Sequence, residues 1–342
     1  MQDEVRSQEN PLGAERVIAP KGALPQGAHR LDASLPLYAD ETLIDVERLN
    51  LDSVSFRQLK ENQEEGATPI ADQILGIVRE RGKMQNPVTG SGGMLLGKVM
   101  QVGPKAPPRF EVGDRVATLV SLTLTPLHLE EILSLHPSDP QVEVRGHAIL
   151  FASSPAVKLP TDLPEAIALS ILDVCGAPAW VRRLTKVGDK VLIVGAGKSG
   201  ALAAAAASEK IVAEDLWISD ISEASLEKTL SLGFAKNAVC ANAQWPFEFH
   251  ESFERAGAPR FDLVVNVSNA PETETASILV AKDGGKVLFF NMATQFSRAV
   301  LSTEGLGRDV ELVMGNGFAQ GHAEYTLDLV RRNNRLIKFF EV

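Results

Sequence analysis

One segment of the chain combines an apolar run with a glycine pattern. Residues 191–194 read Val-Leu-Ile-Val, and three glycines then follow with the spacing G-x-G-x-x-G. A buried strand that runs into this pattern is typical of the first strand, turn and helix of a Rossmann dinucleotide-binding unit. The first glycine allows the tight turn, the second lets the backbone approach a pyrophosphate, and the third lets the helix pack closely on the strand. The cofactor-binding candidates in this turn are Gly195, Gly197, Lys198, Ser199 and Gly200.

An acidic residue stands where such a unit needs one. Asp220 closes the next apolar run, residues 216–219, twenty positions after Gly200. Its carboxylate would accept hydrogen bonds from the adenosine ribose hydroxyls and would repel the 2'-phosphate of NADP. Asp220 therefore predicts NAD as the cofactor, with NADP bound more weakly.

The same turn has two other interpretations. Gly197, Lys198 and Ser199 also read as the end of a triphosphate-binding loop, G-x-x-x-x-G-K-[ST], but that loop needs a glycine where this chain has Leu192. A glycine turn with a purely structural role is the second alternative. The dinucleotide site is favoured because the strand, the glycines and the acidic residue occur together.

Length and charge limit what else the chain can do. Its 342 residues are enough for two domains, and its net charge of -10 argues against binding to nucleic acid or to an anionic membrane. No apolar stretch approaches the roughly 18 residues of a membrane span. Residues 1–6 are acidic and lack the apolar core of a signal peptide. We therefore expect a cytoplasmic protein that binds a small-molecule substrate and forms a homodimer.

The chain changes character near residue 155. Before it, short β-type runs alternate with Pro and Gly, and residues 69–81 carry a helical apolar pattern with Gly82 as its C-cap. After it, strand-like and helix-like segments alternate, which predicts a parallel sheet with right-handed crossovers. The predicted strands are 191–194, 216–219, 263–267, 286–290 and 311–314. The fold class is α/β, with an irregular β domain over 1–155 and a doubly wound Rossmann domain over 156–342.

Two of the predicted strands are followed by polar residues. Ser268 follows the predicted strand 263–267, and Asn291 follows the predicted strand 286–290. An open parallel sheet binds its ligand at the carboxyl ends of its strands. Ser268 and Asn291 are therefore further cofactor-binding candidates, against the alternative that they are ordinary polar loop residues.

Two stretches of the first domain carry a further pattern. Residues 92–103 read GGMLLGKVMQVG and residues 110–116 read FEVGDRV. They resemble the G-H-E-x-x-G-x-V and G-D-x-V motifs of the medium-chain dehydrogenases/reductases. The resemblance implies a GroES-like β domain before the Rossmann domain. Because the chain ends soon after residue 332, we expect only a short C-terminal return and a substrate side built mostly by residues 1–155.

The same resemblance predicts that no metal is bound. Zinc-using members of that family place metal or near-metal residues at the His and Glu of G-H-E, where this chain has Gly93 and Met94. Cys175 falls near the position of a third zinc ligand. One thiolate without its partners cannot complete a three-ligand catalytic site.

Three further stretches narrow the resemblance. Residues 16–22, 49–58 and 86–94 look like the corresponding parts of the family of L-erythro-3,5-diaminohexanoate dehydrogenases of bacterial lysine fermentation. Membership would imply NAD-dependent oxidative deamination, in which a hydride leaves C3 for the nicotinamide and the imine is hydrolysed to 5-amino-3-oxohexanoate and ammonia. Such a site needs an acidic side chain near each nitrogen and a cation near the carboxylate.

The residues expected to do this chemistry each have a simpler alternative. Asp173 lies in the segment expected to line the nicotinamide cleft and is the candidate for the amine, or else a turn residue. Cys175, in the same segment, is a catalytic candidate or a small buried thiol. Arg57 is the candidate carboxylate anchor, because residues 55–57 are expected at a strand end facing the substrate, or else a surface ion-pair residue. The weaker candidates are His128 and His147 as bases, and Glu64 and Asp72 as partners of the 5-ammonium or as a solvated acidic face.

Two other functions compete with amine oxidation. A zinc-free medium-chain reductase of enones or carbonyls would share Gly93 and Met94 but would have an apolar pocket. A non-catalytic redox sensor would keep the glycine turn and Asp220 without needing acids on the substrate side.

Overall fold

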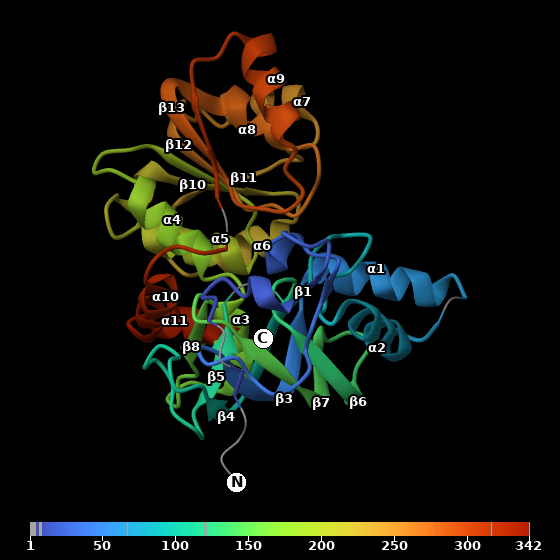
Figure 1. Cartoon of the computed structure of the whole chain (residues 1–342). Helices are drawn as coiled ribbons and strands as arrows, with labels where there is room; N and C mark the ends of the chain where they lie inside the picture. The colour runs from blue at the N-terminus through green and yellow to red at the C-terminus, as the bar shows by residue number, and fades with distance from the viewer. Residues whose placement is uncertain (1–4, 7–8, 67, 120–121, 316, 342) are drawn as a thin grey trace. The chain divides into compact units, whose positions relative to one another are not determined.

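The computed structural model describes residues 5–6, 9–66, 68–119, 122–315 and 317–341. The chain divides into two compact units, Met1–Glu165 and Ala166–Val342. Residues 1–4, which belong to the segment expected not to be a signal peptide, lie outside the described ranges. Figure 1 shows the elements of both units.

The first unit contains a six-stranded antiparallel sheet. The strands lie in the order β6-β7-β3-β4-β5-β8. The bounds are β3 Thr42–Leu51, β4 Gly93–Val102, β5 Arg115–Thr118, β6 Leu127–Leu135, β7 Gln141–Leu150 and β8 Ala156–Lys158. Because β8 pairs with β5, the first unit extends beyond residue 155, where the sequence placed the boundary. A separate antiparallel pair joins β1 (Val17–Ala19) to β2 (Arg30–Leu31), next to the short helical turns η1 (Ala14–Arg16) and η2 (Pro25–Gly27).

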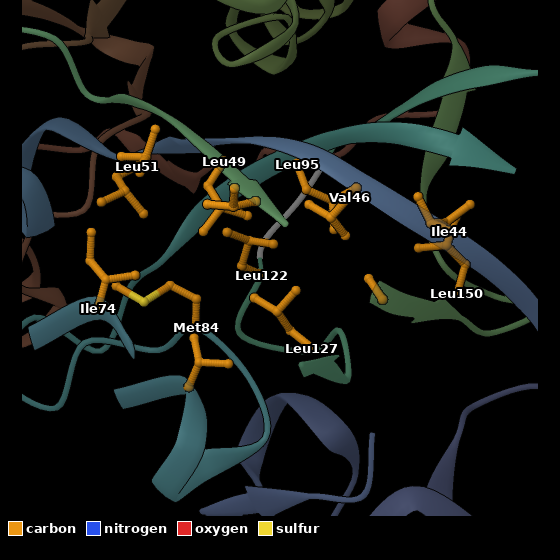
Figure 2. Close-up of a cluster of buried hydrophobic side chains, with 14 of the residues drawn as sticks. Ile44, Val46, Leu49, Leu51, Ile74, Met84, Leu95, Leu122, Leu127 and Leu150 are labelled. Atoms are coloured by element: carbon orange, nitrogen blue, oxygen red, sulfur yellow. The ribbon is translucent and has the colours of Figure 1, made fainter. Parts of the chain in front are cut away.

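Two helices, α1 (Ser53–Glu64) and α2 (Ile70–Arg81), lie side by side in this unit (Figure 1). Gly82 ends α2 as predicted: its φ is 61° and its N–H donates to the carbonyl of Val78 at 2.7 Å. The core forms where the apolar face of α2 meets the sheet, because β3 carries apolar residues on alternate positions. Figure 2 shows this core, which includes Ile44, Val46, Leu49, Leu51, Ile74, Met84, Leu95, Leu122, Leu127 and Leu150.

A charged residue lies in the interior of this unit. The Lys83 side chain is fully buried, and its Nζ donates to the carbonyls of Pro25 at 2.8 Å and Thr123 at 2.7 Å. Burial, together with the charge of Arg81, lowers the pKa of Lys83 to about 8. Above that pH the unfolded chain holds a proton that the folded chain has lost, until the unfolded lysine itself titrates near 10.4.

This difference predicts how stability depends on pH. The free energy of unfolding of the wild type, minus that of Lys83→Met, should rise by up to about 3 kcal/mol between pH 8 and pH 10.5. Urea unfolding at several pH values measures it. The matched control is Lys60→Met, because Lys60 is exposed and paired with Glu64. A difference that stays constant or falls over this interval would contradict the prediction.

The second unit is a doubly wound parallel sheet. Its strands lie in the order β11-β10-β9-β12-β13-β14, and every neighbouring pair is parallel. The bounds are β9 Val191–Val194, β10 Leu216–Asp220, β11 Asn237–Cys240, β12 Phe261–Asn266, β13 Ala281–Phe289 and β14 Glu311–Met314. In chain order this is 3-2-1-4-5-6, the Rossmann arrangement. The predicted α/β fold class is therefore confirmed, and the strand order reverses between β9 and β12, where such sheets bind ligands.

Helices connect these strands. Their bounds are α3 Glu165–Leu172, α4 Gly176–Leu184, α5 Lys198–Ala207, η3 Ala213–Asp215, α6 Glu223–Leu230, α7 Pro246–Arg255, α8 Glu274–Val280, α9 Phe296–Leu306, α10 His322–Arg331 and α11 Asn334–Phe340. Helices α7, α8 and α9 pack together beside β12 and β13, and α4, α5, α10 and α11 form a second group (Figure 1). The alanine run of α5 is buried throughout, so small side chains let this helix pack closely against its neighbours.

Candidate active site

The three glycines after β9 each have a different surrounding. Gly195 has a φ of +111°, a conformation that glycine adopts readily. A Cβ on Gly200 would lie 1.9 Å from the carbonyl oxygen of Gly195, so only glycine lets α5 approach the turn this closely. A Cβ on Gly197 would meet nothing within 4 Å. The backbone at Gly197, at the start of α5, is therefore open to a ligand, as a pyrophosphate site requires.

The carboxylate of Asp220 lies against the same turn. Its Oδ2 accepts the backbone N–H of Ala196 at 2.7 Å, and its Oδ1 accepts that of Ser222 at 2.9 Å. Each carboxylate oxygen can accept more than one hydrogen bond, so ribose hydroxyls can still bind here. Leu192, which stands at the glycine position of a triphosphate loop, is fully buried inside β9. The arrangement fits the adenosine and pyrophosphate of a dinucleotide.

A buried asparagine holds the loops that follow β12 and β13. Asn266 accepts the N–H of Ser268 at 3.1 Å and the side-chain amide of Asn291 at 3.3 Å through Oδ1. Its own amide donates to Thr273 Oγ1 and Ser277 Oγ at 2.8 and 2.9 Å. The two predicted residues Ser268 and Asn291 thus share one partner. Asn266 was not predicted from the sequence, although a polar residue that ends an apolar strand was an available signal.

The segment between α3 and α4 lies next to residues that come directly after the carboxyl ends of strands of the sheet. Lys198, in the first turn of α5, donates to Ser170 Oγ on α3 at 3.2 Å. A Cβ on Gly176 would lie 2.8 Å from both Phe290, after β13, and the carbonyl of Gly317, after β14. The intervening Asp173 is exposed. Asp173 and Cys175 therefore lie in a segment that extends from the glycine turn toward β13.

Cys175 lies in the kind of buried position that is typical of a structural thiol. Its side chain is buried and its Sγ donates to the carbonyl of Leu172 at 3.0 Å. Burial raises the pKa of Cys175, and the negative charge of Asp173 raises it further. The thiol is protonated at neutral pH, whereas nucleophilic and metal-binding cysteines act as thiolates.

One buried histidine at this end of the sheet was missed. His322 begins α10 and is 1% exposed, and within the described part of the chain neither ring nitrogen has a hydrogen-bond partner. Burial lowers its pKa, so the ring is neutral near pH 7. One turn later, Thr326 donates to the carbonyl of Cys175 at 3.0 Å, which ties α10 to the Asp173 segment. No pattern around His322 distinguished it in the sequence.

In the first unit, the expectation that residues 55–57 form a strand end is wrong. Arg57 lies in the first half of α1, with its side chain 67% exposed and its Nε 3.7 Å from Glu61 Oε1. The helix begins here because Asp52 acts as its N-cap, accepting the N–H of Ser55 at 2.9 Å. Glu64 and Asp72 are exposed on α1 and α2.

The two weaker histidine candidates lie together. His128 and His147 pair across β6 and β7, with ring centroids 5.1 Å apart. Both line a cavity of about 410 Å³ that also includes Arg30 and Arg79. His147 Nε2 is hydrogen-bonded to the carbonyl oxygen of Ala33 at 2.8 Å, which fixes its ring.

Gly93 occupies its position for a steric reason. Its φ is +115°, and a Cβ there would lie 2.1 Å from the carbonyl oxygen of Asn50. A histidine at position 93 is therefore incompatible with this backbone. Among the residues that the structure describes, no three His, Cys, Asp or Glu side chains cluster as a metal site would require. The absence of a metal stays a prediction.

The fold and the glycine turn define the class of two-unit, dinucleotide-binding dehydrogenases. Among solved structures, a short chain alcohol dehydrogenase from Escherichia coli CFT073, complexed with NADH, aligns over 87% of this chain and 83% of its own. Its TM-score is 0.55 and its sequence identity is 18%. The N-terminal domain model of L-erythro-3,5-diaminohexanoate dehydrogenase matches residues 15–160.

Two curated relatives have the name L-erythro-3,5-diaminohexanoate dehydrogenase. The protein from Acetoanaerobium sticklandii is 45% identical over 334 residues, which cover 96% of this chain and 97% of the relative. The protein from Fusobacterium nucleatum subsp. nucleatum is 42% identical over 334 residues, which cover 96% of each. The chain belongs to the family of L-erythro-3,5-diaminohexanoate dehydrogenases.

Proposed function

We propose that this protein catalyses the NAD-dependent oxidative deamination of L-erythro-3,5-diaminohexanoate, as a zinc-independent member of the medium-chain dehydrogenases/reductases. The reaction consumes the substrate, NAD⁺ and water and yields 5-amino-3-oxohexanoate, NADH, ammonium and one proton. The observation that carries the proposal is the open backbone at Gly197 beside the Asp220 carboxylate, in a chain whose named relatives match it over nearly its full length. The reaction belongs to lysine fermentation.

The residues of the second unit would hold the cofactor. Gly197 and the first turn of α5 would bind the pyrophosphate, Asp220 the ribose, and the loops held by Asn266 the remaining part. When bound, NAD⁺ supplies the acceptor for the hydride from C3. Lys198 and Ser199 stay predicted cofactor contacts, and Lys198 would have to release Ser170 to reach a phosphate.

The protein must also manage the protons of the amine. We assign Asp173 to the 3-ammonium group, because it lies in the segment that extends from the glycine turn. Loss of one ammonium proton and of the C3 hydride leaves an iminium. Water then adds to C3, and the nitrogen leaves as ammonium. Cys175 stays a candidate site residue, as an uncharged side chain that would line the cofactor site. Arg57 stays the predicted carboxylate anchor, although it would have to leave Glu61.

One assay tests this function. Purified protein is mixed with NAD⁺ and L-erythro-3,5-diaminohexanoate, and NADH absorbance and ammonium release are followed together. We expect both products in equal amounts. No turnover beside clear NAD⁺ binding would remove the proposal and would favour a redox sensor. Oxidation of added NADH or NADPH by enones or simple ketones, without ammonium release, would favour the reductase alternative.

We expect the activity to be independent of metal. Prolonged treatment with a chelator should leave kcat unchanged, because Gly93 and Met94 replace the usual ligand positions. A loss of activity that only zinc restores would refute this prediction.

Asp220 should set the cofactor preference. Asp220→Ala is expected to raise the ratio of kcat/KM with NADP⁺ to that with NAD⁺ about tenfold or more, because the repulsion of a 2'-phosphate is removed. Steady-state kinetics with both cofactors measure it, with Glu223→Ala as the control on the exposed start of α6. An unchanged ratio would show that another residue sets the preference.

The structure bears on only one of the expectations about partners and location. No described helix is long and apolar enough to cross a membrane. The homodimer, the cytoplasmic location and the lack of nucleic-acid binding stay predictions.

A further inference from the structure

The strongest unexplained group in the first unit is the carboxylate of Asp52. Its Oδ1 caps α1 by accepting the N–H of Ser55 at 2.9 Å. Its Oδ2 is buried and has no hydrogen-bond partner within the described residues. Leaving a buried charged acceptor without a partner costs free energy. Such an atom in a folded protein points to a partner that is bound only in the functional state.

The position of Asp52 in the fold connects it to the family pattern. Leu51, the last residue of β3, pairs with Gly93 at the start of β4. A Cβ on Gly93 would lie 2.9 Å from the backbone nitrogen of Asp52. Asp52 thus lies directly beside the position that the sequence comparison aligned with a metal-site histidine.

The surroundings hold Asp52 in place. Ser55 Oγ lies 2.6 Å from Thr89 Oγ1, which joins the first turn of α1 to the loop before β4. Asn86 braces that loop, because its Oδ1 accepts the N–H of Val88 at 2.8 Å and its amide donates to Gln58 at 2.7 Å. No described cation forms an ion pair with Asp52. Hydrogen bonds therefore join the residues around Asp52 to one another, while its Oδ2 lacks a donor among the described residues.

We propose that Asp52 binds the 5-ammonium group of the diamino acid substrate and selects for that group. This inference rests on the proposed function. A primary ammonium has three N–H donors and one positive charge, which is what the unpartnered oxygen lacks.

Two substrates separate this role from a structural one. With Asp52→Asn, kcat/KM for L-erythro-3,5-diaminohexanoate should fall about 10- to 100-fold, mainly through KM. The value for 3-aminohexanoate, which lacks the 5-amino group, should not change. Asparagine caps helices as well as aspartate does, so α1 should remain intact. Asp52→Ser, which also retains a cap, should behave in the same way.

Binding measurements give a second readout. Calorimetric titration of the diamino acid into the NADH complex should show an affinity about tenfold or more weaker for Asp52→Asn, with NADH binding unchanged. Asp45→Asn, on the exposed face of β3, is the matched control and should resemble the wild type.

Several results would overturn the assignment. Equal losses of kcat/KM for both substrates would show that Asp52 acts at the reacting nitrogen or only stabilises the fold. Wild-type kinetics in Asp52→Asn would show that water alone satisfies Oδ2. If the wild type oxidises neither substrate, the proposed function fails, and the calorimetric comparison still decides whether Asp52 binds the 5-ammonium.

Discussion

Replacing Arg16 with methionine is expected to lower the free energy of unfolding by about 3–5 kcal/mol, because it strands a buried carboxylate. The Arg16 side chain is fully buried, and its Nε and Nη2 donate to the two oxygens of Glu41 at 2.9 and 2.6 Å. Nη1 and Nη2 also donate to the carbonyls of Ser34 and Pro36. Methionine fills a similar volume but supplies none of these donors.

Equilibrium urea unfolding of the first unit's signal measures this loss. Arg145→Met is the control, because its ion pair with Glu131 is exposed, and such pairs contribute about 0–1 kcal/mol. Combining Arg16→Met with Glu41→Leu should recover part of the loss, since no charge then remains buried. A loss below about 1 kcal/mol for Arg16→Met would show that the pair is not important for stability.

The nucleotide side of the protein could be predicted because its signals are local. Gly195, Gly197 and Gly200 fall within six positions of one another, and each glycine shapes the backbone of the same short turn. Asp220 is twenty positions away but ends the adjacent strand, so the fold places it beside the turn. The alternation of strand-like and helix-like segments likewise predicted five of the parallel strands, whereas β11 was not predicted.

The first unit was harder to predict because its signals are mixed. Arg57 was assigned to a strand end, yet Asp52 caps a helix that begins immediately after β3. Strand β6 is hard to recognise in the sequence because it lies at the sheet edge, and much of its length is polar and exposed.

The part of the site that could not be predicted from the sequence depends on contacts between residues far apart in the chain. Asn266 reaches Asn291, and Lys198 reaches Ser170, across 25 and 28 positions. The unpartnered oxygen of Asp52 becomes visible only when all of its neighbours are placed. A single sequence shows that a polar residue is present but not whether its hydrogen bonds are satisfied.

The glycine turn allows stability and cofactor binding to be separated by two substitutions of the same kind. Gly197→Ala should lower the melting temperature by only about 2–4 °C, because its Cβ meets no neighbouring side chain or distant backbone within 4 Å and the main cost is a poorer N-cap for α5. The same methyl would occupy the space of the pyrophosphate, so the affinity for NAD⁺ should fall about 10- to 100-fold. Gly305→Ala, also free of contacts and on α9, is the control for an added methyl in this unit.

Gly200→Ala should affect both properties. Its Cβ would lie 1.9 Å from the backbone oxygen of Gly195, and no side-chain rotation can relieve a clash with backbone. Helix α5 must then move away from β9, which should destabilise the second unit by about 1–3 kcal/mol and displace the N–H groups that would bind the pyrophosphate. Thermal unfolding with and without NAD⁺, with calorimetric titration, separates the two effects. If Gly197→Ala bound NAD⁺ as tightly as the wild type, the open backbone at Gly197 would not be where the pyrophosphate binds.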